Sequence, residues 1–339
     1  MRPASLPTSR TVPFRTRVAK ASARPPVVRL ARKDFLSVLD LDPESLEACL
    51  RLAAHLKRER RMTRRAASTQ ALAGQHVALL FEKPSLRTRS TFEIAVRELG
   101  GDVVCPGPDV AFGGREVAAD VARNLERWVA ALVLRTFAHQ RLVEFAVAAP
   151  RLHVVNALTD DEHPCQALAD LLTLREHLGD LRGRTVAFVG DGNNVATSLA
   201  HAAVMLGAHV HIASPEGYEL PDHVLAEAAR TARFGAGVRR FRDPRVAVHG
   251  AAAVYTDTWT SMGQEAETDV RVRVFAPYQV NATLMAQADP EALFMHCLPA
   301  HRGEEVTDEV MDGPSSVIFD QAENRLHVQK ALLLMLLSQ

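Results

Sequence analysis

The sequence predicts an α/β protein with two doubly wound parallel-sheet domains and an active site in the cleft between them. Three observations support this fold class. Short apolar strands alternate with helices in both halves, a turn-rich segment at 179–183 separates the halves, and 339 residues fit about two domains. Because parallel strands are joined by right-handed crossovers, we expect helices on both faces of each sheet.

Helical periodicity and turn signals define the elements of the first half. In segment 44–57, Leu46, Cys49, Leu50, Ala53 and Leu56 share one face of a helix, which the basic run 57–65 continues. The next expected strands are at 76–81, 130–134 and 152–156, and a strand and turn are expected at 102–108. Helices are expected from an N-cap at Ser85 to glycines 100–101 and at 116–129, 140–148 and 165–177. Loops are expected at 109–115 and 157–164.

The second half repeats the alternation. It contains strands at 185–189, 209–213, 252–256 and 293–295, helices at 194–206, 221–231 and 322–337, and a short extended segment at 317–319. We therefore expect a disordered basic tail at 1–32, a first domain formed by 33–165 together with about 322–339, and a second domain at 166–321.

Composition narrows the class of protein. Apolar residues make up 47% and charged residues 24%, and the formal net charge is zero, so we expect no nucleic-acid partner and no membrane partner. The four cysteines are widely spaced, which is typical of reduced thiols in a cytoplasmic protein.

The N-terminal segment is basic. Residues 1–33 hold nine arginines and lysines and no acidic residue. That pattern fits either a mitochondrial or plastid transit peptide or a disordered tail. We favour the tail, since no apolar face recurs at helical spacing, and we expect a cytoplasmic protein.

Segment 85–89 combines the features of an anion site. It lies where the strand 76–81 turns into a helix whose apolar face is Phe92, Ala95, Val96 and Leu99. Free backbone N–H groups and the positive end of a helix dipole favour a phosphate there, beside the guanidinium groups of the same segment. A solvated basic helix start is the alternative interpretation.

The residues that follow the predicted strands carry further candidate chemistry, because ligands of open α/β sheets bind at the carboxyl ends of strands. The first half places cations and neutral donors there, which suit a phosphate and a carbonyl. The second half places a carboxylate, an amide and a thiol there, which suit an amine. We therefore expect two substrates, one on each domain. The sequence Val189-Gly190-Asp191-Gly192 resembles the start of a dinucleotide fingerprint, but Val195 occupies the third glycine position, which argues against a nicotinamide cofactor.

Two candidates also have structural interpretations. His163-Pro164 fits a turn that only starts a helix, and Cys297 fits a buried small apolar residue.

Taken together, these motifs resemble the aspartate/ornithine transcarbamoylase family from about residue 33 to the end of the chain. Its carbamoyl-phosphate motif is matched by Ser85-Leu86-Arg87-Thr88-Arg89, and its His-Pro-Cys-Gln motif by His163-Pro164-Cys165-Gln166. The segment 257–263, Asp-Thr-Trp-Thr-Ser-Met-Gly, and the segment 296–299, His-Cys-Leu-Pro, resemble the members that use ornithine. Arg325, in Glu323-Asn324-Arg325, resembles the late arginine of the whole family.

The resemblance implies transfer of the carbamoyl group of carbamoyl phosphate to the δ-amino group of L-ornithine, giving L-citrulline and phosphate for arginine biosynthesis, with no cofactor and no metal. The implied carbamoyl-phosphate-binding residues are Ser85, Leu86, Arg87, Thr88, Arg135, His163, Gln166, Cys297, Leu298 and Arg325. The implied ornithine-binding residues are Asn194, Asp257, Ser261 and Met262. The implied catalytic residues are Arg87, Arg135, His163, Asp257, Cys297 and Arg325.

The chain departs from the family pattern at two positions. Leu86 replaces a threonine, so we expect its backbone N–H to serve the phosphate, and Ala111 stands where many members carry a glutamine that reaches a neighbouring subunit. The family implies a homotrimer or a multiple of trimers that share the first domains. The alternatives are a carbamoyltransferase for putrescine or N-acylated ornithine, a catabolic enzyme, and a non-catalytic binding protein that kept the fold.

Overall fold

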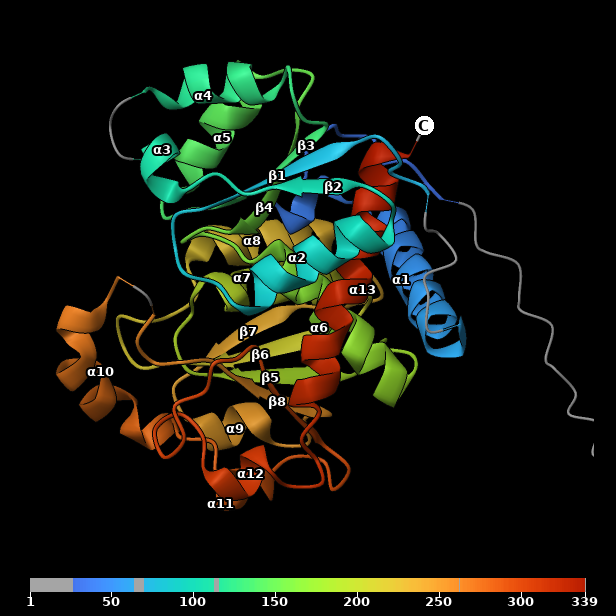
Figure 1. The fold of residues 1–339 in the computed structure, drawn as a ribbon. Coiled ribbons are helices and arrows are strands. Elements are labelled where there is room, and N and C mark those ends of the chain that lie inside the picture. Colours follow the sequence, from blue (N-terminus) through green and yellow to red (C-terminus); the bar gives the residue numbers. More distant parts are fainter. Residues whose placement is uncertain (1–26, 64–69, 113–115, 262, 339) are drawn as a thin grey trace, which may run out of the picture.

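The computed structural model describes residues 27–63, 70–112, 116–261 and 263–338. It contains two parallel sheets, with strand orders β2-β1-β3-β4 and β7-β6-β5-β8-β9, stacked one above the other in Figure 1. Two parallel-sheet domains with flanking helices are therefore present, as the sequence predicts. Within the described residues, no helix is both long enough and apolar enough to cross a membrane.

The first sheet is buried on both faces. Its strands are β1 (His76–Phe81), β2 (Asp102–Val104), β3 (Ala131–Arg135) and β4 (His153–Leu158). Along β1, Val77 and Leu79 pack in one apolar cluster, whereas Ala78 and Leu80 pack in another. Burial on both sides explains why these strands read as continuous apolar runs. The associated helices are α1 (Pro43–Thr63), α2 (Arg87–Glu98), α3 (Pro108–Phe112), α4 (Ala118–Leu125) and α5 (His139–Ala148).

The second sheet is built in the same way. Its strands are β5 (Thr185–Val189), β6 (His209–Ala213), β7 (Val238–Phe241), β8 (Ala253–Thr256) and β9 (Leu293–His296). Its helices are α7 (Asn194–Met205), α8 (Asp222–Thr231), α9 (Pro244–Val248), α10 (Thr268–Phe275), α11 (Ala282–Met285) and α12 (Asp308–Met311), and the 3₁₀ turns are η1 (Val38–Asp40), η2 (Glu265–Glu267) and η3 (Ala276–Tyr278).

Two long helices connect the domains. Helix α6 (Pro164–Leu178) lies between the sheets, and α13 (Ile318–Leu337) runs along one side of the molecule from the lower domain to the upper one (Figure 1). One apolar cluster contains Leu79 of β1, Leu168 of α6, Phe188 of β5 and Leu332 of α13. The two domains therefore share a continuous core.

Most expected elements form, but three expectations were wrong. Ser85 is not the N-cap of α2, because Leu86 holds that position, without a side-chain capping bond. The expected loop at 109–115 begins as helix α3, and residues 113–115 lie outside the described part. Segment 317–319 is not extended throughout, because α13 already begins at Ile318, after Ser316 forms an isolated bridge with Phe294.

The last residues of the predicted basic tail contact the end of α13. Residues 1–26 of the basic tail lie outside the described part, while Leu30 donates its backbone N–H to the carbonyl of Met335 at 3.2 Å. Ala111 lies in α3. The four cysteines are free thiols, as expected.

Candidate active site

A cleft of about 900 Å³ opens between the carboxyl edges of the two sheets. In each sheet, successive strands are added first on one side of the first strand and then on its other side. The change of side falls between β1 and β3 in one sheet and between β5 and β8 in the other. Such switch points are where open α/β sheets bind ligands. The cleft is lined at these points by Arg87 and Arg135 from the first sheet and by Asn193 and Asp257 from the second.

The start of α2 faces the cleft. The helix begins at Arg87, and Ser85, Leu86, Arg87 and Thr88 all line the cavity. The first N–H groups of a helix lack partners within the helix and form the positive end of its dipole. This end of α2 is therefore suited to bind an anion.

Three arginines surround this point. Arg87 follows β1, Arg135 ends β3, and Arg325 projects from α13. Burial and the neighbouring Arg325 and Arg87 lower the pKa of Arg135 to about 10. Burial also lowers the pKa of Arg87 and of Arg325. Three positive charges held close together favour a ligand with more than one negative charge.

Arg325 is fixed by two polar contacts. One guanidinium nitrogen donates to Thr88 Oγ1 at 2.9 Å, and another donates to Gln166 Oε1. Gln166 is buried and does not line the cleft itself. It lies behind Arg325.

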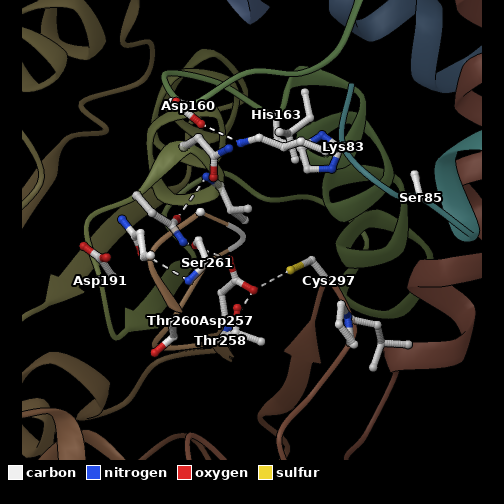
Figure 2. A pocket seen from close by; sticks show the side chains of 18 of the residues that line it. Lys83, Ser85, Asp160, His163, Asp191, Asp257, Thr258, Thr260, Ser261 and Cys297 are labelled. Atoms are coloured by element: carbon white, nitrogen blue, oxygen red, sulfur yellow. Dashed lines mark hydrogen bonds and ion pairs between the residues drawn. The ribbon is translucent and has the colours of Figure 1, made fainter. Parts of the chain in front are cut away.

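His163 stands at the start of α6, in the cleft (Figure 2). Burial and the two nearby arginines, Arg325 and Arg135, hold its pKa well below the ordinary value. The imidazole is therefore neutral near pH 7 and can donate one N–H to a substrate oxygen. Its backbone N–H donates to Ser198 Oγ at 2.9 Å, and Ser198 in turn donates to Glu162.

The other side of the cleft holds a carboxylate with three donors. Cys297 Sγ donates to Asp257 Oδ1 at 2.9 Å, and Asn193 Nδ2 donates to Asp257 Oδ2 at 2.8 Å (Figure 2). The backbone N–H of Thr258 donates to the same carboxylate. Burial and Asp257 raise the pKa of the Cys297 thiol well above its ordinary value, so the sulfur stays protonated. The pair offers a negative oxygen and a neutral sulfur.

The turn after β8 completes this side. Ser261 lines the cleft, and Met262 lies outside the described residues. Arg271 of α10 is buried and donates to the carbonyl of Trp259 at 2.9 Å and to Asp191 at 2.7 Å. Leu298 also lines the cleft and has a φ of 60°, a region that non-glycine residues seldom adopt.

The structure brings most of the sequence-predicted residues together. The cleft is lined by Ser85, Leu86, Arg87, Thr88, Arg135, His163, Asn194, Asp257, Ser261, Cys297, Leu298 and Arg325. Asn194 also donates its side-chain amide to the carbonyl of Thr159 at 2.5 Å, which ties the two domains together at the floor of the cleft.

Sequence reasoning missed some polar residues of the cleft, among them Lys83 and Arg271. Buried Lys83 donates to Asp160 Oδ1 at 2.6 Å and lies 4.0 Å from the ring centroid of Phe137 (Figure 2). Asn193, Asp191 and Arg271 also line the cavity. The rule that ligands bind after strand ends already pointed to Asp191 and Asn193, which follow the predicted strand 185–189, and it would also have found Lys83, which follows the strand 76–81. Arg271 carried no such signal.

Two groups of metal-ligand side chains lie at the second sheet. The ligand atoms of Asp257, His296 and Cys297 lie within 4.8 Å of one another, as do those of His301, Glu304 and Glu305. In the first group, His296 uses one ring nitrogen with Glu305 at 3.1 Å and the other with the N–H of Leu298 at 2.9 Å. The Cys297 thiol is bonded to Asp257. Both ring nitrogens of His296 and the hydrogen of the Cys297 thiol are therefore engaged in hydrogen bonds within the protein.

The fold and the cleft define a two-domain α/β enzyme that binds an anionic group on one sheet and faces it with a carboxylate and a thiol on the other. Two family models match the chain. The carbamoyl-P binding domain of aspartate/ornithine carbamoyltransferases matches residues 33–176, and the Asp/Orn binding domain matches residues 182–336. The chain belongs to the aspartate/ornithine carbamoyltransferase family.

Similar proteins cover nearly the whole chain. The ornithine carbamoyltransferase of Anoxybacillus flavithermus is 48% identical over 312 residues, which are 91% of this chain and 98% of that protein. That of Acidothermus cellulolyticus is 52% identical over 308 residues, 90% of this chain and 96% of that protein. The structure of the Pyrococcus furiosus ornithine carbamoyltransferase is 45% identical, with a TM-score of 0.86, and covers 91% of this chain and 97% of that one.

Proposed function

We propose that this enzyme transfers the carbamoyl group of carbamoyl phosphate to the δ-amino group of L-ornithine, giving L-citrulline and phosphate. The observation that carries the proposal is the arrangement of charge across the cleft. Arg87, Arg135 and Arg325 lie on one side, and the Asp257–Cys297 pair lies on the other. The names of the similar proteins support ornithine as the acceptor.

The phosphate of the donor binds at the start of α2. Arg87 and Thr88 offer charged and neutral donors, and the exposed Leu86 offers only its backbone N–H. Arg135 and neutral His163 donate to the carbamoyl oxygen, where negative charge develops as the carbon is attacked. Arg325 reaches the same region from α13, held by Thr88 and Gln166.

The acceptor lies on the side of the second sheet. A δ-ammonium resembles the lysine ammonium, with an ordinary pKa of about 10.4, so it must lose one proton before it attacks. It loses a second as the new C–N bond forms, while the bond between the carbamoyl carbon and the phosphate oxygen breaks. The Asp257 carboxylate orients the amine, and Asn194, Ser261 and Met262 hold the α-amino-acid end of ornithine.

An assay of citrulline formation tests the proposal directly. Purified enzyme supplied with carbamoyl phosphate should carbamoylate ornithine far faster than putrescine or N-acetylornithine. Arg87→Ala should lose at least about 100-fold in kcat/KM, since it removes a charged hydrogen bond to the phosphate. Faster carbamoylation of putrescine would refute the acceptor, and unchanged citrulline formation by Arg87→Ala would refute the donor site.

We also propose the biological setting of the reaction. The enzyme acts in the cytoplasm, in the direction of citrulline for arginine biosynthesis, and assembles as a homotrimer or a multiple of trimers. Exposed apolar side chains on the first domain, among them Leu86, Val104 and Val117, support association through that domain. Light scattering should give a mass of three chains or a multiple, and disruption of the gene should create a requirement for arginine.

A further inference from the structure

A buried carboxylate lies behind the cleft, at the junction of both domains. Asp170 is on α6 and its side chain is fully buried. Its Oδ1 accepts hydrogen bonds from Gln166 Nε2 at 2.8 Å and from Gln321 Nε2 at 2.7 Å. Its Oδ2 accepts a hydrogen bond from the hydroxyl of Tyr255 at 3.2 Å. These donors come from α6, α13 and β8, so one side chain joins three elements.

The side-chain amide of Gln166 can form both of its hydrogen bonds in only one orientation. Its Nε2 faces Asp170, and its Oε1 faces the guanidinium of Arg325. A carboxylate oxygen can only accept from the amide, and a guanidinium can only donate. If the amide of Gln166 turned over, both contacts would become repulsive. Asp170 therefore fixes the acceptor that holds Arg325 in the cleft.

The orientation of the Gln321 amide is fixed in the same way, by its hydrogen-bond partners. Both hydrogens of Gln321 Nε2 are used, one by Asp170 and one by the hydroxyl of Tyr255 at 2.9 Å. Its Oε1 accepts the backbone N–H of His296 at 3.0 Å. His296 immediately precedes Cys297, so the amide of Gln321 holds the turn that carries the thiol.

We propose that Asp170 is a positioning residue that sets both sides of the active site at once. Through Gln166 it aligns Arg325 on the carbamoyl-phosphate side, and through Gln321 it aligns the His296–Cys297 turn on the acceptor side. This inference rests on the proposed function, because its readout is the kinetics of carbamoyl transfer.

Asp170 is not adjacent to the reacting groups. It does not line the cleft, and no part of its side chain is exposed to solvent. A buried carboxylate that contacts no substrate is costly unless its oxygens are hydrogen-bonded. Here three donors meet that requirement, and two of them lead to residues of the cleft.

The decisive comparison is between Asp170→Leu and Asp170→Asn. Leucine leaves both glutamine amides without an acceptor, so we expect KM for carbamoyl phosphate to rise about tenfold and kcat to fall about tenfold or more. Asparagine keeps an oxygen toward both glutamines, so its constants should stay within about threefold of the wild type. A matched control is Thr173→Val, one turn away, where the lost contacts are the 2.9 Å hydrogen bond from Asn324 and the 2.8 Å hydrogen bond that the hydroxyl donates to the carbonyl of Ala169. Its kinetic constants should not change.

Single changes in the two glutamines separate the two arms without altering the buried carboxyl group, and they keep the test open if Asp170→Leu does not fold. Gln166→Met should raise mainly KM for carbamoyl phosphate, and Gln321→Met should raise mainly KM for ornithine.

The inference is overturned if Asp170→Leu is as active as the wild type, if Asp170→Asn is as impaired as Asp170→Leu, or if the two glutamine variants affect the same constant equally. Failure of the wild-type enzyme to form citrulline would instead refute the proposed function.

Discussion

Single residues in this cleft owe their chemistry to burial and to their neighbours. Burial lowers the pKa of three arginines on one side and raises the pKa of a thiol on the other. The same burial, with help from Arg325 and Arg135, keeps His163 neutral. The cleft therefore offers a multiply charged anion site next to donors that carry no charge of their own.

Cys297 should act as a neutral hydrogen-bond donor and not as a nucleophile. Cys297→Ser keeps a donor for Asp257, so kcat should fall less than about tenfold, whereas Cys297→Ala should lose more. The thiol pKa lies well above its ordinary value, so iodoacetamide should modify Cys297 slowly at pH 8. Equal activity of the serine and alanine variants, or rapid alkylation at this pH, would contradict the assignment.

His163 should contribute without titrating near neutral pH. Because its pKa is held well below the ordinary value, the pH profile of kcat/KM for carbamoyl phosphate should show no histidine ionisation between pH 6 and 7. His163→Gln should lower kcat/KM about 10- to 100-fold and leave the shape of that profile unchanged. A limb near pH 6.5 that disappears in His163→Gln would show that the imidazole titrates in this range.

At the scale of secondary structure, the turns that follow the strands determine where these side chains lie. The turn after β5 leaves no room for a side chain at Gly192. A side chain at Gly192 would bring its Cβ within 2.2 Å of the backbone nitrogen of Leu220. The next residue, Asn193, caps α7 through Val195 and Ala196 and donates to Asp257. The position of the acceptor carboxylate therefore depends on this turn.

Gly192→Ala should damage the acceptor side selectively. The methyl group must displace backbone at Leu220, which costs about 1–3 kcal/mol of stability and moves Asn193. KM for ornithine should rise more than KM for carbamoyl phosphate. Gly237→Ala is the matched control, because an added Cβ there meets no atom within 4 Å, and it should behave as the wild type.

Strand–turn–helix motifs were predictable from the sequence, and weakly patterned elements were not. The strands 76–81, 185–189 and 209–213 have the expected limits. In the first two, burial on both faces gives a nearly continuous apolar run. Strand β7 was missed because it is an edge strand with exposed Arg239 and Arg240, which gives no apolar run. Helices α10 and α11 were missed because they are short. Contacts such as those of Asp170 join distant segments, and one sequence gives no signal for them.

At the scale of the whole molecule, buried carboxyl groups such as Glu162 hold together segments that are far apart in the sequence. Glu162 accepts hydrogen bonds from Ser37 Oγ, from the backbone N–H of Val38 at 3.2 Å and from Ser198 Oγ at 2.9 Å. It joins the segment before α1 to α7 and, through Ser198, supports His163. Burial raises its pKa to about 7.

The contribution of Glu162 to stability should therefore fall as the pH rises from about 5 to about 7. A carboxyl group with a raised pKa in the folded state stays protonated there while the unfolded chain, with an ordinary value near 4.5, has already lost the proton. The contribution of Glu162 is then present at low pH and is lost as the pH passes 7, and it amounts to roughly 3 kcal/mol. Glu162→Gln removes this decrease, so the urea midpoint of the variant should rise more, or fall less, between pH 5 and 7 than that of the wild type. An unchanged slope would contradict the role of Glu162.

Helix α13 begins beside the second sheet and ends against the first, and it carries Gln321 and Arg325 to the cleft on the way. The ribosome makes this helix after every strand of both sheets. During synthesis the apolar surface of the first domain that α13 will cover therefore stays exposed, because α13 begins at Ile318, 160 residues after β4 ends at Leu158. A nascent chain of this kind should need protection from aggregation late in translation, and catalytic competence should arise only once that final helix has left the exit tunnel and docked.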